Sequence, residues 1–374
     1  MHNLYLAALC AVVPGLGRKR ILALTQRLGG ARAVFEADAD TLLGTGLVRE
    51  ESVANFIANR KTSWPRLIAN FCQREGVRLV ALGDGDYPGA LRQTSDPPLV
   101  LYVKGALPTA EYCFAVVGAR ACTAYGERAA AYFAGELARR GIPIVSGGAR
   151  GIDAAAHEAC LDVGGQTIAV MGCGLDMDYP PQNGALFRRI VANGGALVTE
   201  FPPGVAPLPS NFPARNRIIV GLAQGVLVAE AAKRSGAIIT ANIAADEGRD
   251  VYCVPGNIFD RTSIGCHELI RTGAKLVDTP QDILEDREGC ELRMRRRVSQ
   301  PTIFEASQSA ANVAAAPTTK LGAELLRLLQ GGARTLEELT EQSGADFAAV
   351  SMELLELQAA GLADVDQAQR YYRR

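Results

Sequence analysis

The sequence predicts an α/β fold in which an extended Rossmann-like, doubly wound parallel sheet is flanked by two smaller domains. Apolar strand patterns alternate with helical patterns over residues 80–285, as in parallel sheets covered by helices on both faces. Residues 1–75 show only short helical patterns separated by glycine turns, and residues 320–374 show three helical patterns followed by a hairpin pattern. We therefore expect an N-terminal helical domain, a Rossmann-like domain and a C-terminal winged-helix domain.

The N-terminal domain, residues 1–75, is predicted to be of the SAM or helix-hairpin-helix kind. The turn Val13-Pro14-Gly15-Leu16-Gly17 precedes a helical pattern from Arg18 to Leu28. A helix-hairpin-helix turn offers backbone N–H groups to a phosphate. A plain pair of helices that only pack against each other explains the same pattern and is the favoured interpretation.

The middle domain, residues 80–285, is predicted to carry the ligand at the carboxyl ends of its strands. The predicted strands are Phe114–Gly118, Ile142–Ser146, Thr167–Met171, Ala196–Thr199, Gly225–Val228 and Asp250–Val254. One helix is expected around Tyr125 to Arg140, and another after Asp153.

Residues 286–319 are rich first in arginine and then in alanine, serine, glutamine and proline, which predicts a flexible linker. The winged-helix domain follows, with helices at Leu321–Leu329, Thr335–Gln342 and Asp346–Ala360 and a hairpin from Gly361 to Tyr372. The third helix would be the recognition helix, but it carries acidic residues and no lysine or arginine. We interpret the domain as a protein-contact module whose only plausible nucleic-acid contacts are Arg370, Tyr371, Tyr372, Arg373 and Arg374.

The composition limits the kinds of ligand. Lys and Arg number 39 and Asp and Glu 40, so a polyanion must be held by a local site. Nine scattered cysteines with no C-x-x-C pair, and three histidines, favour neither a disulfide framework nor a metal site. The apolar start lacks the basic segment of a signal peptide, and no apolar run is long enough to span a membrane. We expect a cytoplasmic protein without a membrane partner.

The main chemical signal is the segment after the second predicted strand. Ser146 leads into Gly147-Gly148-Ala149-Arg150-Gly151, and a helix follows from Ile152 and Asp153. Glycines permit close approach of the backbone, and a helix N-terminus presents unpaired N–H groups to a phosphate. Phosphate binding is therefore favoured over a turn without a ligand. The preceding strand ends in Gly118-Ala119-Arg120, which would project an arginine over the same edge.

Common phosphate cofactors fit the sequence poorly. A dinucleotide site would have G-x-G-x-x-G after the first strand and an acidic residue at the end of the second. Here those positions hold Gly118-Ala119-Arg120 and Ser146. No G-x-x-x-x-G-K-[ST] segment occurs, which disfavours ATP hydrolysis at a P-loop. We expect no cofactor.

Two further segments carry basic and polar side chains. Arg215, Asn216 and Arg217 precede an apolar helix or strand, and Lys233-Arg234 precede the turn Ser235-Gly236. Arginine forks match phosphate oxygens and also stack on bases. One of Arg215 and Arg217 is equally explained as an ion-paired structural arginine.

Together these segments resemble the DprA/Smf family. The resemblance rests on Gly118-Ala119-Arg120, Ser146 to Asp153, Gly174 with Tyr179-Pro180 and Asn183, Phe212 to Ile219, Ser235-Gly236 with Ile239-Thr240-Ala241, and Val254-Pro255-Gly256. It implies a homodimeric single-stranded DNA-binding protein of bacterial natural transformation, which protects incoming strands and loads the RecA recombinase. It also implies an extended Rossmann fold and no established catalytic activity. The DNA-binding residues expected on this basis are Gly118, Arg120, Ser146, Gly147, Gly148, Ala149, Arg150, Gly151, Ile152, Asp153, Asn183, Arg215, Asn216, Arg217, Lys233, Ser235 and Gly236.

The chain departs from the family pattern at several positions. Many relatives have a lysine where Pro181 and Gln182 stand, and another where this chain has Pro207 to Ser210. Each phosphate contact contributes to binding, so the loss of two lysines bears on affinity. Relatives also carry an asparagine near the Cys266-His267 pair, and two adjacent residues do not make a metal site.

Two alternatives remain. The glycine turn is also similar to nucleoside-monophosphate phosphoribohydrolases, which carry P-G-G-x-G-T-x-x-E with a catalytic glutamate. The nearest segment here, Val254-Pro255-Gly256-Asn257-Ile258, lacks that glutamate, and Glu200 and Glu230 are more simply explained as capping or pairing residues. The other alternative is a scaffold that acts through its flanking domains. We predict no catalytic residue and no metal ligand.

Overall fold

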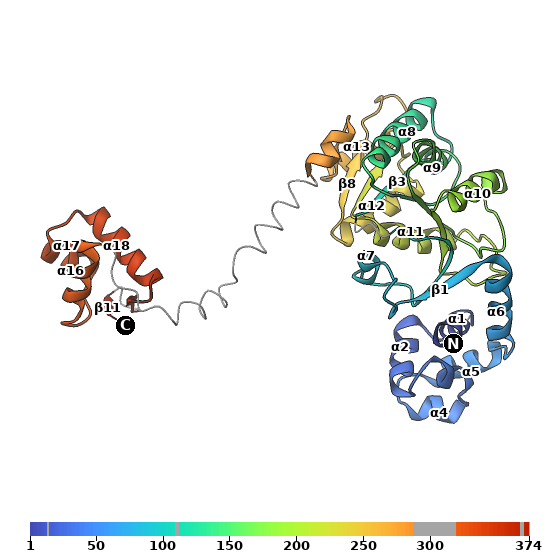
Figure 1. The fold of residues 1–374 in the computed structure, drawn as a ribbon, viewed down its shortest axis with the longest axis horizontal. Coiled ribbons are helices and arrows are strands. Elements are labelled where there is room, and N and C mark those ends of the chain that lie inside the picture. Colours follow the sequence, from blue (N-terminus) through green and yellow to red (C-terminus); the bar gives the residue numbers. More distant parts are fainter. Residues whose placement is uncertain (13–14, 109–111, 287–318, 367–369, 374) are drawn as a thin grey trace. The chain divides into compact units, whose positions relative to one another are not determined.

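The computed structural model describes residues 1–374 except 13–14, 109–111, 287–318, 367–369 and 374. It divides into two compact units, Met1–Asp286 and Arg287–Arg374 (Figure 1). The predicted linker at 286–319, with its arginine run, lies almost wholly outside the described residues, as do Gln369 and Arg374. No helix in the described part is long and apolar enough to cross a lipid bilayer.

Short helices fill the chain before the first strand (Figure 1). They are α1 (His2–Cys10), α2 (Arg18–Arg27), α3 (Ala31–Glu36), α4 (Ala39–Gly44), α5 (Glu50–Asn59) and α6 (Trp64–Glu75). Leu24 and Phe56 are completely buried among them, in an apolar cluster that also takes in Tyr102 and Phe187. These helices therefore share one continuous core with the part of the chain that follows.

That part is built on a nine-stranded sheet in the order β1-β2-β6-β5-β4-β3-β7-β8-β9. Its strands are β1 (Val77–Ala81), β2 (Val100–Gly105), β3 (Phe114–Val117), β4 (Ile144–Ser146), β5 (Thr167–Val170), β6 (Ala196–Thr199), β7 (Gly225–Val228), β8 (Asp250–Cys253) and β9 (Lys275–Leu276). The six strands predicted from the sequence are all present, and they pair in parallel. The prediction of a wholly parallel sheet was wrong. β1 pairs antiparallel with β2, and β2 pairs antiparallel with β6.

Helices cover both faces of this sheet, as alternate residues of each strand show. Phe114 and Val116 face the core that contains α8 (Ala124–Arg139) and α9 (Ile152–Asp162). Ala115 and Val117 face the opposite core, with α11 (Asn211–Leu222), α12 (Gly236–Asp246) and α13 (Ile264–Arg271). Further helical elements of this unit are α7 (Gly89–Arg92), η1 (Pro181–Asn183) and α10 (Gly184–Ala192), and residues 280–286 are also helical. Every residue of β3, β5 and β7 is buried, as expected for parallel strands that are covered by helices on both faces.

The strand order reverses at β3, which lies between β4 and β7. The chain moves outward from β3 through β4, β5 and β6, returns to β7 on the other side, and moves outward again to β9. The loops that follow β3 and β7 therefore diverge at the carboxyl edge. Such a point is where doubly wound sheets bind ligands.

The second unit has the order of elements expected from the sequence. It comprises α16 (Lys320–Leu329), α17 (Leu336–Ser343), α18 (Phe347–Ala359), β10 (Ala363–Val365) and β11 (Tyr371–Arg373). The two strands pair antiparallel, and Arg334 forms an additional bridge with Tyr371. Leu325, Leu339 and Leu354 are completely buried in its core. The capping box between Thr335 and Glu338 fixes the start of α17.

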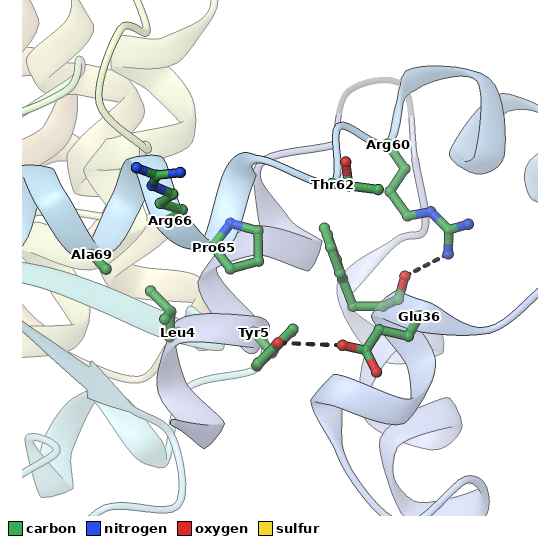
Figure 2. Close-up of a pocket in the computed structure, with 9 residues that line it drawn as sticks. Leu4, Tyr5, Glu36, Arg60, Thr62, Pro65, Arg66 and Ala69 are labelled. Carbon is green, nitrogen blue, oxygen red and sulfur yellow. Dashed lines mark hydrogen bonds between the residues drawn. The ribbon is translucent and has the colours of Figure 1, made fainter.

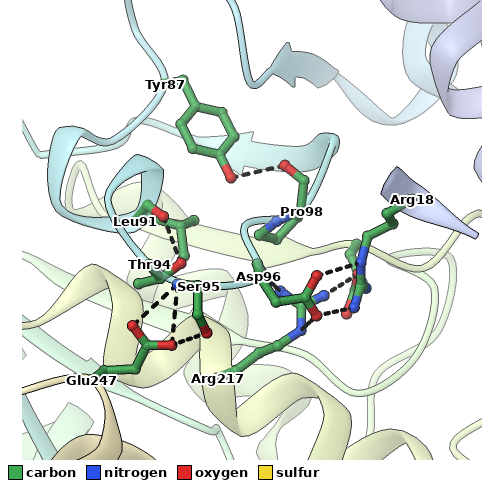
Figure 3. A network of polar contacts seen from close by, with 10 residues as sticks. Arg18, Tyr87, Leu91, Thr94, Ser95, Asp96, Pro98, Arg217 and Glu247 are labelled. Atoms are coloured by element: carbon green, nitrogen blue, oxygen red, sulfur yellow. Dashed lines mark hydrogen bonds and ion pairs between the residues drawn. The ribbon is translucent and has the colours of Figure 1, made fainter. Parts of the chain in front are cut away.

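A charged network joins α2 to the sheet domain (Figure 3). Arg18 of α2 pairs with Glu200 at 2.9 Å and with Asp96. Arg217 of α11 pairs with the same Glu200 carboxylate at 2.5 Å and donates to the Asp96 carbonyl oxygen at 2.7 Å. One carboxylate thus serves two arginines from segments far apart in the sequence.

We predict that Glu200→Ala lowers the free energy of unfolding by about 2 kcal/mol. The substitution removes one of the two carboxylates that Arg18 and Arg217 share, and both side chains of the Glu200–Arg217 pair are only about 15% exposed. Urea unfolding measures the effect, as a shift of the transition midpoint with an unchanged dependence of the unfolding free energy on urea concentration. The matched control is Asp162→Ala, which breaks an exposed pair with Arg189 and should change stability by less than about 0.5 kcal/mol. Equal shifts in the two variants would contradict the prediction.

Candidate functional site

A cavity of about 710 Å³ opens at the carboxyl edge of the sheet, at the point where the strand order reverses. Its walls come from the turn after β3, the loop after β4, the segment after β7 and the start of α11. A smaller cavity of about 40 Å³ adjoins it and is lined by Arg120, Gly147, Ala149, Arg150, Gly172, Tyr179, Pro180, Phe212 and Arg215. The two cavities share Arg120, Ala149, Tyr179, Phe212 and Arg215, so we treat them as one pocket.

The turn after β3 is held in close contact with its neighbours. A side chain at Gly118 would place Cβ 2.6 Å from Ile152 and 2.9 Å from the Glu230 carbonyl oxygen. The Ala119 N–H donates to that carbonyl at 2.8 Å. Arg120 then projects into the pocket, with its guanidinium carbon 4.8 Å from the centre of the Phe212 ring. The described residues include no hydrogen-bonded or ion-paired partner for the Arg120 guanidinium, so its N–H donors face the pocket.

The loop after β4 is fixed by its own backbone and by Asn183. Gly148 and Gly151 have φ angles of 66° and 75°, which favour glycine. A Cβ at Gly151 would also lie 2.5 Å from the Ala119 carbonyl oxygen. Asn183 donates to the carbonyl oxygens of Gly148 and Ala149 at 3.0 and 3.1 Å. The loop is therefore rigid before any ligand binds, and α9 begins directly after it.

Two buried charges, Arg215 and Asp153, stand beneath this loop. Arg215 Nη1 donates to the Gly147 carbonyl oxygen at 2.7 Å and also to the Val170 carbonyl oxygen. The Asp153 carboxylate accepts from the Ala149 N–H at 3.2 Å. A Cβ at Gly147 would lie 2.7 Å from both Arg215 Nη2 and Asp153 Oδ2, so only glycine fits between the two charges.

Burial shifts the pKa of both groups. It lowers the pKa of Arg215 to about 10, against the opposing attraction of Asp153. It raises the pKa of Asp153, while the Arg215 charge acts in the opposite direction. Arg215 remains a cation at neutral pH, and it is 4% exposed. It therefore supplies positive potential to the pocket floor and holds the ends of β4 and β5 together.

The wall opposite this loop is the N-terminus of α12. Ser235 precedes the helix as its N-cap, and its hydroxyl oxygen is buried with no partner among the described residues. Asn216 donates to the Gly236 carbonyl oxygen at 3.4 Å. Helix N-termini carry partial positive charge and unpaired N–H groups, so this wall also favours an anion.

The structure brings most of the predicted site residues together. Those that line the pocket are Gly118, Arg120, Gly147, Ala149, Arg150, Asp153, Arg215, Asn216, Ser235 and Gly236. Those that shape the loop from beneath or beside it are Ser146, Gly148, Gly151, Ile152 and Asn183.

Two predicted residues lie elsewhere. Arg217 belongs to the network with Glu200 and Asp96 (Figure 3). Lys233 is exposed and pairs with Glu268 at 2.7 Å. Neither lines the pocket. Their assignment as DNA contacts therefore has no support from the geometry and stays a prediction.

The site also contains residues that sequence reasoning did not assign to it. Tyr179 and Phe212 line the pocket with their ring centres 5.6 Å apart. Both stand in segments that carried the family resemblance, next to Pro180 and Pro213. For Phe212 the available signal was its place just before Arg215 and Arg217; Tyr179 has no comparable basic neighbours in the sequence.

The acidic residues considered as catalytic bases have structural partners. Glu230 accepts from the Thr123 N–H at 2.9 Å, at the start of α8. Glu200 pairs with Arg18 and Arg217. Among the described residues that line the pocket, Asp153 is the one carboxylate. No group of His, Cys, Asp and Glu in the described chain is arranged to hold a metal ion.

A second cavity, of about 480 Å³, lies among the N-terminal helices (Figure 2). Tyr5 donates to Glu36 at 3.3 Å, and Arg60 Nη1 donates to the Phe35 and Ala37 carbonyl oxygens. None of the predicted site residues lines this cavity. Its main polar groups are engaged with each other or with the backbone.

Comparisons with known proteins give a consistent picture. Residues 78–288 match the family model of DNA recombination-mediator protein A. The chain is 44% identical over 254 residues to Protein Smf of Escherichia coli K12, covering 67% of this chain and 66% of that protein. It is 48% identical over 204 residues to DNA processing protein DprA of Streptococcus pneumoniae, covering 54% of this chain and 72% of that protein.

Two solved structures are similar along their whole length. The X-ray structure of DprA from Streptococcus pneumoniae matches with a TM-score of 0.61 and 36% identity, over 76% of this chain and 95% of that one. DNA processing protein A from Helicobacter pylori, described for its unique single-stranded DNA binding mode, matches with a TM-score of 0.51 and 29% identity. That match covers 57% of this chain and 96% of that one.

A buried histidine, His157, lies on α9, the helix that follows the loop of the pocket. Thr167 Oγ1 donates to the Ile144 carbonyl oxygen at 2.7 Å, so the His157 Nδ1–H must donate to Thr167 at 2.7 Å. His157 Nε2 then carries no proton and has no partner in the described structure. Burial lowers the pKa of His157 to about 3, with a smaller contribution from the Arg215 charge. Because folding lowers the pKa of His157, the neutral imidazole contributes its full stabilisation above about pH 6.5, the ordinary pKa. This contribution to the free energy of unfolding is lost as the pH falls towards 3.

We predict that His157→Gln makes the protein less sensitive to acid, since glutamine can still donate to Thr167 and does not titrate. Between about pH 7.5 and pH 5 the parent should lose about 2 kcal/mol more unfolding free energy than the variant, because the pKa difference corresponds to about 1.4 kcal/mol per pH unit. Urea denaturation at both pH values measures the difference. Identical pH dependence in parent and variant would show that His157 is not held neutral.

Proposed function

The chain belongs to the DNA recombination-mediator protein A family, also called DprA/Smf, and from this membership we propose that its pocket binds single-stranded DNA. The observation that carries the proposal is Arg120. Its guanidinium lies 4.8 Å from the Phe212 ring centre, in the pocket, without an ionic partner in the described residues. An arginine placed on an aromatic ring at a strand end is suited both to a phosphate oxygen and to a base.

Phosphate recognition is supported by the loop after β4. Arg150 lines the smaller cavity beside Arg120, and Arg215 adds a buried positive charge below. The N-termini of α9 and α12 both lie at the pocket. Backbone N–H groups and arginines of this kind bind phosphates without regard to sequence.

Base recognition is supported by the aromatic side. Tyr179, 36% exposed and 5.6 Å from Phe212 between ring centres, provides a ring face for an unpaired base, and stacking tolerates any base. A paired base inside a duplex has no free face to offer. Stacking in the pocket therefore favours a single strand over a double helix.

The wider role is proposed from the family. We propose that the chain protects incoming single-stranded DNA and helps to load RecA during natural transformation, acting in the cytoplasm as a homodimer. Retention of RecA on an oligonucleotide should rise in the presence of the chain and not in the presence of Arg120→Ala. Leu276 of β9 is 53% exposed and is the apolar side chain chosen to test self-association. Sedimentation of the parent and of Leu276→Asp tests the dimer.

The C-terminal unit is proposed to be a winged helix that contacts protein. Its α18 exposes Phe347, Met352 and Leu355, which are 52 to 67% exposed. The same helix carries Glu353 and Glu356 and no basic residue. An acidic helix with exposed apolar side chains is better suited to a protein surface than to a DNA groove. Deletion of residues 319–374 should leave oligonucleotide affinity unchanged if this proposal holds.

We also propose that the chain is not an enzyme. The nucleotide-processing alternative needs a free carboxylate in the pocket, and Asp153 is buried against the Ala149 N–H beside Arg215. Purified protein incubated with AMP should release no adenine. Release that is abolished by Asp153→Asn would favour the enzyme alternative instead.

We predict that Arg120→Ala weakens binding of an unstructured oligonucleotide by about tenfold, because one cation and one stacking partner are lost. The slope of log affinity against log salt should become shallower by about 0.7, as expected for one phosphate contact on a single strand. Fluorescence anisotropy over a salt series measures both quantities. Arg215→Ala is unsuitable here, because Arg215 bonds to the backbone of β5 and the β4 loop.

The matched control for Arg120→Ala is Arg74→Ala. Arg74 is an exposed arginine of α6 whose partner is Glu75, so the substitution removes the same net charge away from the pocket. Arg74→Ala should bind like the parent. Parental affinity and salt slope in Arg120→Ala would show that the pocket is not the DNA site.

A further inference from the structure

The loop between β8 and α13 exposes two large apolar side chains. Ile258 is 74% exposed and Phe259 is 86% exposed, the latter the highest value for an aromatic residue in the described chain. All residues from Asn257 to Arg261 are exposed. An aromatic ring presented in this way needs an explanation, because its burial would stabilise the fold.

The loop is held in place at both ends. Pro255 accepts a hydrogen bond from Tyr125 Oη at 2.6 Å, and His267 Nε2 lies 3.1 Å from the Gly256 carbonyl oxygen. Inside the loop, the Phe259 N–H donates to Asn257 Oδ1 at 3.0 Å, and the Ser263 N–H donates to the Asp260 carbonyl oxygen at 3.0 Å. A backbone fixed by these contacts keeps the Phe259 ring in solvent.

The loop is also continuous with the rim of the pocket. Thr262, directly after its exposed part, lines the pocket together with Ala232 and Ser235. The Gly265 N–H donates to the Ala231 carbonyl oxygen at 2.8 Å, which ties the start of α13 to the segment after β7. A chain that leaves the pocket on this side passes next to the loop.

Positive charge accompanies the ring. Arg261 follows Phe259 in the loop, and Arg234 is exposed in the neighbouring segment; among the described residues neither forms an ion pair. Lys233 is paired with Glu268, and Asp260 is the acidic residue of the exposed loop. An exposed ring and unpaired arginines on neighbouring segments are the groups with which proteins hold single strands without sequence preference.

We propose that Phe259 forms a second stacking subsite for single-stranded DNA, outside the pocket, with Arg261 and Arg234 contacting the phosphates on either side. The inference rests on the proposed function of the pocket. It assigns the direction in which the strand leaves the pocket, past Thr262 towards α13. The occupant is an unpaired base of the same strand that the pocket holds.

The first experiment compares oligothymidines of about 4 and about 16 nucleotides, which span the known range of site sizes. Phe259→Ala should bind the longer strand about tenfold more weakly, as expected for one lost base stack, and the shorter strand like the parent. Phe259→Tyr should retain the parental affinity for both. Phe347→Ala, which removes an exposed phenylalanine from the acidic helix α18, is the matched control and should leave both affinities unchanged.

The second experiment gives a signal from the site itself. The chain has one tryptophan, Trp64, in α6. In Phe259→Trp, the added fluorescence should be quenched by the longer oligonucleotide and not by the shorter one, after subtraction of the parental signal. Base stacking on the new ring is the cause of the quenching.

The outcomes separate the two proposals. If Phe259→Ala binds the longer strand like the parent while Arg120→Ala binds both strands weakly, the pocket stands and the second subsite is overturned. If Phe259→Ala loses self-association instead of DNA affinity, the ring belongs to a protein contact and the subsite is likewise overturned. If the parent binds neither strand, the proposed function falls, and the subsite with it.

Discussion

The pocket depends on two opposite charges, those of Arg215 and Asp153, that are buried on either side of Gly147. Burying either charge alone in an apolar interior would cost desolvation free energy, and the attraction between the two charges offsets part of that cost. Arg215 also satisfies the carbonyl oxygens of Gly147 and Val170, where two parallel strands end and their ladder bonds stop. Together with the Asn183 hydrogen bonds to Gly148 and Ala149, this arrangement holds the β4 loop at the start of α9.

The same arrangement explains how a chain with almost no net charge can hold a polyanion. Arg120, Arg150 and Arg215 line the pocket, whereas Asp153 is the one carboxylate among its described lining residues. Arg120 is available to a ligand, whereas Arg217 is neutralised by Glu200 and Lys233 by Glu268. Binding at such a site is local and depends on a few contacts, so each arginine contributes a large share of the affinity.

Sequence reasoning predicted the six central strands and the glycine loops because both have strong local signals, namely short apolar runs and fixed glycine spacings. It missed β1 and β2, although Val100 to Gly105 is an apolar run, because their antiparallel pairing does not belong to the alternating pattern. It grouped Arg215 with Arg217, yet two positions on a helix differ by about 200° in direction, so one faces the pocket and the other the charged network. Ion-pair partners such as Glu200 are distant in sequence and leave no local signal.

The core that α1 to α6 share with the sheet has a consequence for how this protein can vary. Leu9 and Ile68 belong to the same apolar cluster as Tyr102 of β2 and Phe187 of α10, so these helices and the sheet domain share one core. A boundary that composition places near residue 76 is therefore not a boundary of cooperative unfolding. The helical segment and the sheet should gain and lose structure together, which makes recombination of this segment between homologues far less tolerated than its appearance as a separate module suggests.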